Sequence, residues 1–271
     1  MVRLQRVVKR YGRAAPVLAG VDLEVPAGVL LQVVGGNGAG KSTLLQILAG
    51  VSGVSSGEVL GRPRICGYVP QSGGVHRGLS PHSYLSQLGR IRGLTARAAR
   101  GRAEVLLDRL DVGTGRDAEL ATASGGTQRK AVIAQAFLVP AELLVLDEPF
   151  DGLDAVSAAV LTRMLLQAAA DGAAVVLTDH RGQLPGAVVH ELVGGRLTVG
   201  ATGMVTVLLV HGSGMPAAEP VWGELPGVLT VTVTADQVRL LVSAAACDEV
   251  LSTALSRGWS IRSVNPETYL R

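Results

Sequence analysis

A glycine-rich stretch from Val33 to Leu45, VVGGNGAGKSTLL, constrains the fold more than any other part of the chain. An apolar run stops at its first pair of glycines, and helix-forming residues resume at Lys41. The order predicts a β-strand, a tight loop and an α-helix, and the spacing fits the phosphate-loop motif G-x-x-x-x-G-K-S/T. The alternative is an ordinary glycine-rich turn. The flanking strand and helix, which phosphate binding requires, favour the phosphate loop.

Each residue type in this loop suits the binding of a nucleotide triphosphate. Glycines let backbone N–H groups reach phosphate oxygens, because a Cβ would block the approach and many such positions need a positive φ. The helix that begins near Lys41 adds the positive end of its dipole. Lys41 can bridge the terminal phosphates, and the Ser42 hydroxyl can bind Mg²⁺. The residues expected to bind the nucleotide are Gly35, Gly36, Asn37, Gly38, Ala39, Gly40, Lys41, Ser42 and Thr43.

Two carboxylates follow a second apolar segment, Leu143 to Leu146. A segment that is apolar on both faces predicts a central strand of a parallel sheet, and ligands of such sheets bind at the carboxyl ends of the strands. Asp147 is suited to hold Mg²⁺ through water, and Glu148 to polarise the water that attacks the γ-phosphate. Together with the phosphate loop, the pair predicts hydrolysis rather than binding alone. A structural role for both acids is the alternative.

Four further features have an ordinary and a functional interpretation. Tyr11, upstream of the phosphate loop, could stack on adenine or be a half-exposed tyrosine at a strand end. Gln71, just past a strand, could reach the metal or the attacking water, or be a surface glutamine. Ser124–Gly126 could form a second anion site at a helix start or a plain capped turn. His180, after the strand Ala173–Thr178, could be an incidental histidine, but its place at a strand end lets it reach the γ-phosphate or orient the water. The residues alone favour the ordinary interpretation of Tyr11 and Gln71.

Composition limits the class of protein. A chain of 271 residues is long enough for one α/β domain of about 200 residues and a small appendage. Although 48% of residues are hydrophobic, no window reaches the roughly 18 uninterrupted apolar residues of a membrane span, and the first residues lack a secretion signal. The two cysteines form no disulfide or zinc pattern. A net charge of +3 and 3% aromatic residues give no reason to expect nucleic acid binding.

The remaining periodicity predicts a helical insertion and a small tail. Residues 81–120 show apolar stripes at helical spacing, with arginines on the solvated faces. The stripes are Tyr84, Leu85, Leu88 and Ile91, then Val105, Leu106 and Leu110. Beyond a linker at residues 200–203, strands are expected near residues 205–210, 228–234, 238–242 and 260–264. A helix from Asp248 to Arg257 should carry Leu251 and Leu255 on one face.

In their order along the chain, these features resemble the ATP-binding subunits of ABC transporters. The matching motifs are an aromatic before the phosphate loop, GGNGAGKST, YVPQ at 68–71, the Ser-Gly-Gly signature at 124–126, LLVLDEP, the Asp-loop at 151–154, and His180. The resemblance implies that Tyr11 stacks on adenine and that Gln71 touches Mg²⁺ and senses the membrane partner. It also implies that Ser124, Gly125 and Gly126 contact the γ-phosphate of ATP held by the opposite subunit of a head-to-tail dimer.

The resemblance implies a fold as well as partners. We expect a P-loop NTPase of the ABC type over residues 1–200, which is an α/β domain with a mixed sheet core, a helical subdomain at about 76–125 and an N-terminal antiparallel part. A small C-terminal α+β accessory domain of ferredoxin-like type should follow at 204–271. The cofactors would be ATP and Mg²⁺. The partners would be a separately encoded permease and a second ATP-binding subunit, expected to form a homodimer, with no nucleic acid. The chain would lie in the cytoplasm, on the inner face of the membrane through the permease.

The tail looks like that of ATPases that serve bacterial drug, lipid or polysaccharide exporters, so an exporter is expected. One departure matters: the usual Leu-Ser-Gly-Gly-Gln begins with Ala123 and ends with Thr127, which predicts a working but slower site. A soluble ABC ATPase acting on ribosomes, nucleic acid or cofactor assembly is the alternative. Another is a regulatory subunit that binds ATP without hydrolysis, which the intact Lys41, Asp147, Glu148 and His180 argue against.

Overall fold

A computed structural model describes residues 2–73, 78–113, 116–179, 184–199, 204–211, 222–225, 227–234, 237–243 and 246–266. The chain divides into two compact units. The first comprises Met1–Ala187 with Glu191–Thr198, and the second comprises Val188–His190 with Val199–Arg271. The linker predicted at residues 200–203 lies outside the described residues. No helix in the described ranges combines the length and the apolar character that crossing a membrane requires.

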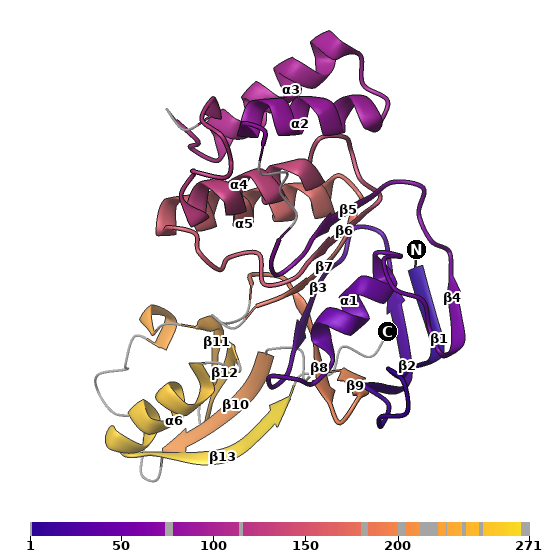
Figure 1. Cartoon of the computed structure of the whole chain (residues 1–271). Coiled ribbons are helices and arrows are strands. Elements are labelled where there is room, and N and C mark those ends of the chain that lie inside the picture. The colour runs from indigo at the N-terminus through magenta and orange to yellow at the C-terminus, as the bar shows by residue number, and fades with distance from the viewer. Residues whose placement is uncertain are drawn as a thin grey trace. The chain divides into compact units, whose positions relative to one another are not determined.

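A six-stranded sheet runs through the first unit (Figure 1) in the order β5-β6-β7-β3-β8-β9. Its first four strands pair in parallel. Every residue of β6 and β7 is buried, which confirms the prediction of a central strand with both faces covered. The strands are β5 (Cys66–Val69), β6 (Leu143–Leu146), β7 (Ala174–Thr178), β3 (Leu30–Val34), β8 (Val188–Val193) and β9 (Arg196–Val199).

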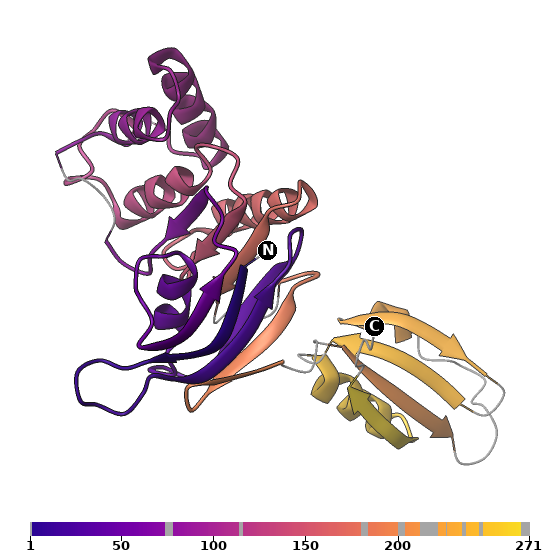
Figure 2. The same cartoon turned by 90° about the vertical axis from the view of Figure 1, so that its right-hand side faces the viewer.

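A three-stranded antiparallel sheet, drawn in indigo and violet in Figure 2, forms the N-terminal part. Its order is β2 (Leu18–Val25), β1 (Val2–Lys9) and β4 (Ser56–Leu60). This sheet is the N-terminal antiparallel part that the resemblance implies. Because four of the five β4 residues are exposed, this edge strand lacks the apolar alternation that identifies its neighbours.

The helix after the phosphate loop, α1 (Lys41–Leu48), is anchored by its apolar residues. Leu44, Leu45, Ile47 and Leu48 are at most 1% exposed and share a core with Leu31 and Val33 of β3 and with the three-stranded sheet. Burial of each such side chain stabilises the fold by about 1.5–3 kcal/mol. The phosphate loop is therefore held between two packed elements.

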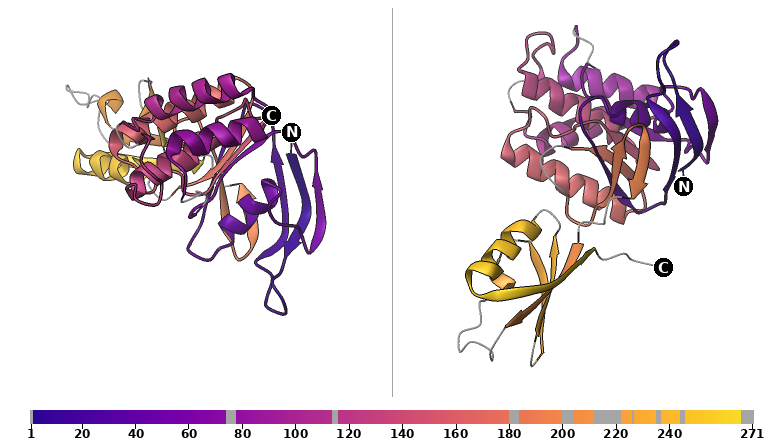
Figure 3. Two further views of the ribbon diagram at one scale, coloured as in Figure 1. Left: turned by 45° about the horizontal axis from the view of Figure 1, so that its top comes forward. Right: turned by 90° about the horizontal axis from the view of Figure 1, so that it is seen from below.

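Four more helices lie in the described part of this unit (Figures 1 and 3), where α2 and α3 form a pair and α4 packs against both of them. They are α2 (Pro81–Ile91), α3 (Ala96–Arg109), α4 (Gly125–Ala136) and α5 (Ala155–Ala170). Each begins after a residue whose side chain accepts a hydrogen bond from a backbone N–H in the first turn: Ser80, Thr95, Ser124 and Asp154. Such caps satisfy N–H groups that the helix itself cannot pair.

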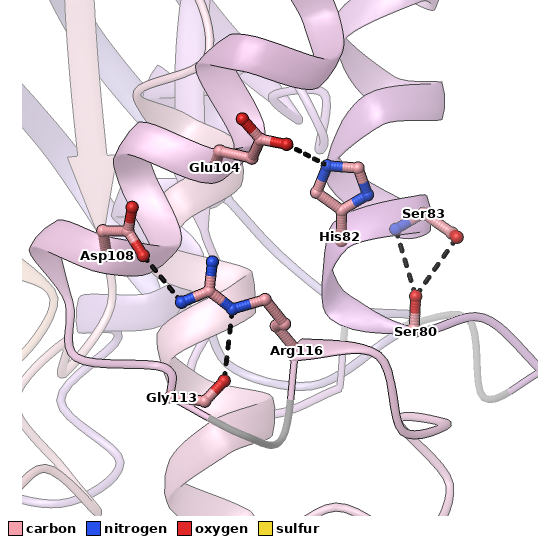
Figure 4. A network of polar contacts seen from close by, with 7 residues as sticks. All are labelled: Ser80, His82, Ser83, Glu104, Asp108, Gly113 and Arg116. Atoms are coloured by element: carbon pink, nitrogen blue, oxygen red, sulfur yellow. Dashed lines mark hydrogen bonds and ion pairs between the residues drawn. The ribbon is translucent and has the colours of Figure 1, made fainter.

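Polar contacts link the pair α2 and α3 to the segment that follows them (Figure 4). Arg116 Nη2 lies 2.7 Å from Asp108 Oδ1, and its Nε donates to the Gly113 carbonyl at 3.2 Å. His82 Nε2 of α2 lies 3.8 Å from Glu104 Oε1 of α3. Partly exposed ion pairs of this kind typically contribute less than about 1 kcal/mol, so apolar packing holds the pair together.

The predicted apolar stripes are wrong at their ends. Ile91 is 80% exposed and Val105 54% exposed, whereas Leu85, Leu106 and Leu110 are buried. The buried face of α2 passes instead through Gly89, where an added Cβ would lie 3.0 Å from Ala99 Cβ of α3. This close approach of the two helices turns Ile91 toward solvent. The arginines expected on solvated faces also differ, because Arg92 and Arg102 donate to backbone carbonyls of Gln135 and Phe137.

The second unit contains a four-stranded antiparallel sheet in the order β11-β12-β10-β13. Its strands are β10 (Met204–His211), β11 (Val228–Val233), β12 (Gln237–Ser243) and β13 (Trp259–Pro266), with a short 3₁₀ helix η2 (Trp222–Glu224). Counted along the chain, this order matches the split βαβ, or ferredoxin-like, arrangement. Within the unit, the Trp222 and Trp259 rings meet edge to face, with centroids 5.6 Å apart.

The helix of this unit, α6 (Cys247–Ser256), packs Leu251 against the core as predicted, but the face it buries does not extend to Leu255. Cys247, Val250 and Ala254 are buried, while Leu255 is 58% exposed. The helix begins one residue earlier than predicted, and the bulky Trp259 ring shares the core with Val250 and Ala254. These small side chains leave room for the ring, so the larger Leu255 stays outside.

Both cysteines are free thiols in their folded surroundings. Burial raises the pKa of the Cys66 thiol to about 11, with Arg92 acting in the opposite direction. The pKa of the Cys247 thiol is also raised, by burial and by the neighbouring Asp248. Neither thiol is therefore ionised to any extent at neutral pH.

Candidate functional site

The phosphate loop joins β3 to α1 in the geometry that the motif predicts. Gly40 precedes the helix with φ +103°, and a Cβ there would lie 2.9 Å from Val17 Cγ1. A Cβ on Gly35 would lie 2.5 Å from the Leu192 carbonyl oxygen. Both positions therefore require glycine for space as well as for conformation.

Lys41 lies across this loop, with a side chain that is almost completely buried. Its Nζ donates to the Gly35 carbonyl at 2.7 Å and to the Gly36 carbonyl at 3.2 Å. The loop borders a hollow of about 580 Å³. The residues that line the hollow are Val17, Asn37, Gly38, Ala39, Gly40, Lys41, Ser42, Thr43, Gln71 and Glu148. Backbone N–H groups at a helix start together with an ammonium form a site for phosphate groups.

The two predicted carboxylates, Asp147 and Glu148, follow β6. A hydroxyl from the neighbouring strand contacts the side chain of Asp147 and the backbone of Glu148. Thr178, at the end of β7, is fully buried. Its Oγ1 donates to Asp147 Oδ1 and accepts from the Glu148 N–H, both at 2.8 Å. Asp147 is 1% exposed, and its N–H donates to the Val69 carbonyl at 2.8 Å. No sequence motif marks Thr178, although alignment of the carboxyl ends of the two predicted strands places its hydroxyl beside the carboxylates.

Gln71 and Glu148 meet at the wall of the hollow. Gln71 Nε2 donates to Glu148 Oε2 at 3.1 Å. Glu148 has φ +46°, a left-handed conformation that is costly for a residue with a side chain. The strained backbone therefore directs the carboxylate toward the glutamine that follows the neighbouring strand.

Tyr11 lies beside the start of α1. Its hydroxyl is 3.5 Å from Thr43 Oγ1, and the Lys9 ammonium is 5.0 Å from the ring centroid. The residue is 50% exposed. An exposed ring next to the phosphate loop leaves a face for a base, so stacking on adenine stays a prediction.

Ser124 begins α4 as a helix cap, and no residue of Ser124–Gly126 lines the hollow. The Ser124 hydroxyl accepts from the Thr127 N–H at 3.1 Å and lies 3.0 Å from the Thr127 hydroxyl. α4 packs against α2, α3 and β5. The signature and the phosphate loop of one chain are thus not brought together, and His180 lies outside the described residues.

The Asp-loop ends at Asp154, which caps α5. Its carboxylate accepts from the Ser157 N–H at 2.7 Å and from the Ser157 hydroxyl at 3.0 Å, and Lys130 Nζ of α4 lies 3.3 Å away. The Ser157 backbone and hydroxyl hydrogen bonds, followed by Lys130, lower the pKa of Asp154 to about 2.

This lowered pKa makes a prediction about stability and pH. The unfolded aspartate titrates near ~3.9, so the contribution of the carboxylate is complete above about pH 4 and is lost as the pH falls through the folded value. Thermal unfolding should therefore show that Asp154→Ala is less stable than wild type at neutral pH, with a difference that shrinks toward acid. Asp154→Asn, which can cap but cannot ionise, serves as the control. A difference that did not change with pH would contradict the role of the charge.

Ser42, Gln71 and Asp147 offer a hydroxyl, an amide and a carboxylate. These are the oxygen donors that Mg²⁺ prefers. Ser42 and Gln71 line the hollow, and Asp147 precedes Glu148 at its wall. The donor chemistry therefore fits the predicted metal, whereas the described residues contain no cluster of three or more histidine, cysteine or acidic residues that would suit another one.

The fold and the site together define a P-loop protein that binds a nucleotide triphosphate at the carboxyl edge of a parallel sheet. Comparison with known proteins narrows this class. The sequence pattern of the ABC transporter family matches residues 18–151. A solved structure of an ATP-binding subunit of an ABC transporter is 25% identical, with a TM-score of 0.67 over 73% of this chain and 88% of that one. A dimeric ATP-binding cassette bound to ADP and Pi, 22% identical, agrees in fold, with a TM-score of 0.67 over 73% of this chain and 96% of that one.

Proteins with similar sequences are also ATP-binding proteins by name. YhaQ of Bacillus subtilis, an uncharacterized ABC transporter ATP-binding protein, is 29% identical over 67% of this chain and 63% of its own length. DrrA of Streptomyces peucetius, a daunorubicin/doxorubicin resistance ATP-binding protein, is 39% identical over a region that covers 50% of this chain and 44% of DrrA. CcmA of Cupriavidus pinatubonensis, a cytochrome c biogenesis ATP-binding export protein, is 36% identical over a region that covers 65% of this chain and 81% of CcmA. ZnuC of Cereibacter sphaeroides, a zinc import ATP-binding protein, is 35% identical over a region that covers 66% of this chain and 72% of ZnuC.

The chain therefore belongs to the ABC transporter family as an ATP-binding subunit. The matched regions span less than two thirds of YhaQ and DrrA. Both export and import proteins occur among the relatives.

Proposed function

We propose that the chain binds ATP with Mg²⁺, hydrolyses ATP at Glu148 and powers a separately encoded membrane permease that works as an exporter. The contact between the Gln71 amide and the Glu148 carboxylate, 3.1 Å long, carries this proposal. It lies on the wall of the hollow that the phosphate loop borders. A carboxylate in this place can accept the proton of a water that attacks the terminal phosphate.

The other side chains have distinct roles in the proposal. Lys41 exchanges its two loop carbonyls for phosphate oxygens. Ser42, Gln71 and Asp147 would hold Mg²⁺, and the ion would supply positive charge that stabilises the phosphate groups. Tyr11 stacks on the adenine, and His180 orients the attacking water.

A second copy of the chain would complete the site. Ser124–Gly126 do not line the hollow of their own chain, yet the backbone N–H groups at the start of α4 suit a phosphate. In a head-to-tail homodimer, the signature of each subunit would face the ATP of the other. ATP would then close the dimer and hydrolysis would reopen it, because a conformational cycle requires ligands that bind its states differently.

Export is proposed over import on the strength of particular relatives. DrrA, at 39% identity, is a drug resistance protein, and CcmA is an export protein. Because a zinc import protein is also similar, at 35% identity, the direction of transport is part of the proposal. A soluble ABC ATPase that acts on ribosomes, nucleic acid or cofactor assembly is the competing function, with the same nucleotide chemistry.

Purification of the tagged full chain from detergent-solubilised membranes of its host tests the transport function. We expect an integral membrane protein to co-purify and to raise ATP hydrolysis in the eluate, and we expect Lys41→Ala to abolish that stimulation. Recovery with ribosomes or nucleic acid instead, with no membrane partner, would overturn the transport function while leaving the nucleotide site in place.

A further inference from the structure

A half-buried guanidinium joins the two segments that carry Gln71 and Glu148. Arg129 lies in α4, one turn after the Ser124–Gly126 signature. Its Nη1 donates to the Pro70 carbonyl at 2.6 Å and to the Gln71 carbonyl at 3.3 Å. Its Nη2 donates to the Asp147 carbonyl at 3.0 Å and to the Glu148 carbonyl at 2.6 Å. One side chain thus contacts the backbone at the ends of both β5 and β6.

The chemistry of arginine suits this position. Its planar group presents several N–H donors in fixed directions, and hydrogen bonds from a charged donor are about twice as strong as neutral ones. Burial lowers the pKa of Arg129, while Asp151, Asp147 and Glu148 act in the opposite direction. A lysine, as a point charge on a flexible stem, could not contact both segments with the same geometry.

The contact has a particular consequence for Glu148. The peptide groups on either side of its Cα are both held: Thr178 accepts from the N–H at 2.8 Å, and Arg129 donates to the carbonyl at 2.6 Å. Between these two contacts, Glu148 has the left-handed φ of +46°. Such a conformation persists only where its surroundings over-determine it. Without Arg129, the Glu148 carbonyl would keep only the longer hydrogen bond from the Asp151 N–H, at 3.2 Å.

We propose that Arg129 is a positioning residue for ATP hydrolysis, which fixes the backbone of Gln71 and Glu148 so that their side chains meet at the wall of the nucleotide hollow. The inference rests on the proposed role of Glu148. It assigns Arg129 an effect on the chemical step and none on nucleotide binding, because Arg129 does not line the hollow.

Steady-state and single-turnover ATP hydrolysis by the full-length chain test the inference. Arg129→Ala should lower kcat by about 10- to 100-fold, since small displacements of catalytic groups cost rates of this order. The KM for ATP and the affinity for a fluorescent ATP analogue should stay within about twofold of wild type, because the phosphate loop is untouched. Arg129→Lys should give an intermediate kcat and should keep the protein folded if the alanine variant unfolds.

Arg102→Ala is the matched control. Arg102 is also an arginine that burial partly desolvates, and it donates through Nε and Nη2 to the Phe137 carbonyl at 3.3 and 2.9 Å, away from the hollow. Its loss should leave kcat near wild type. If Arg102→Ala and Arg129→Ala lower kcat equally, or if Arg129→Ala mainly raises KM, Arg129 has a general structural role and the inference is wrong.

A double-mutant cycle with Glu148→Gln separates positioning from stability. If Arg129 acts through Glu148, Arg129→Ala should lower the residual rate of Glu148→Gln by less than about threefold, because residues that act as a unit are not additive. Full multiplication of the two losses would overturn the inference. A Glu148→Gln variant with normal turnover would instead overturn the proposed function, so the two failures are distinguishable.

Discussion

Replacement of Glu148 with glutamine is expected to reduce ATP turnover by about 10²- to 10⁴-fold, as loss of a general base does. The substitution keeps the shape of the side chain, and its amide oxygen can still accept from Gln71 Nε2, which lies 3.1 Å from the carboxylate in the wild type. The phosphate loop is unaffected. ATP should therefore bind and stay bound, and the closed dimer should accumulate.

Hydrolysis assays together with size-exclusion chromatography in Mg²⁺ and ATP measure both effects. Glu142→Gln is the matched control, because Glu142 is exposed at the other end of the same strand. It should behave as wild type in both assays. If Glu148→Gln retained normal turnover, Glu148 would have no part in the mechanism.

Replacement of Lys41 with alanine is expected to reduce turnover by about 10²- to 10³-fold, the usual cost of losing one donor to a charged transition state. Lys41 is 7% exposed, and its Nζ rests on the carbonyls of Gly35 and Gly36. Unlike Glu148→Gln, this variant should also bind ATP more weakly, because the ammonium contacts phosphate in the ground state as well.

Titration with a fluorescent ATP analogue distinguishes the two variants. Arg90→Ala removes the same unit of charge from an exposed position of α2 and should bind the analogue normally. Equal affinities of wild type and Lys41→Ala for the analogue would show that the hollow beside the phosphate loop is not the nucleotide site.

Local sequence patterns predicted the parts of the site that lie on single segments. The phosphate loop could be identified because spacing alone requires a strand, a turn and a helix, and β3 and α1 occupy these places. Asp147 and Glu148 could be placed because a strand that is apolar on both faces must be central. The meeting of Gln71 with Glu148 follows from the parallel pairing of β5 with β6.

Contacts between distant segments could not be predicted in this way. Arg129 reads as one basic residue in a helix, and only the packing of α4 against the ends of β5 and β6 brings its guanidinium to four carbonyls. The left-handed φ of Glu148 could not be predicted from the sequence, because glycine is the residue that usually indicates such a conformation. The predicted burial of Ile91 and Leu255 is wrong for a related reason, since both side chains are exposed. Helical spacing identifies the apolar face of a helix, but the neighbouring element decides which edge of that face is covered.

The state of the two cysteines has a practical consequence for observing the proposed cycle. With the pKa of Cys66 near 11 and that of Cys247 raised, thiol-directed reagents at neutral pH meet almost no native thiolate. Both native thiols should therefore react more slowly with such reagents than an exposed cysteine of ordinary pKa. One cysteine introduced at an exposed site such as Val51 would carry a spin label or fluorophore selectively, so that subunit closure could be followed as a change in distance in real time.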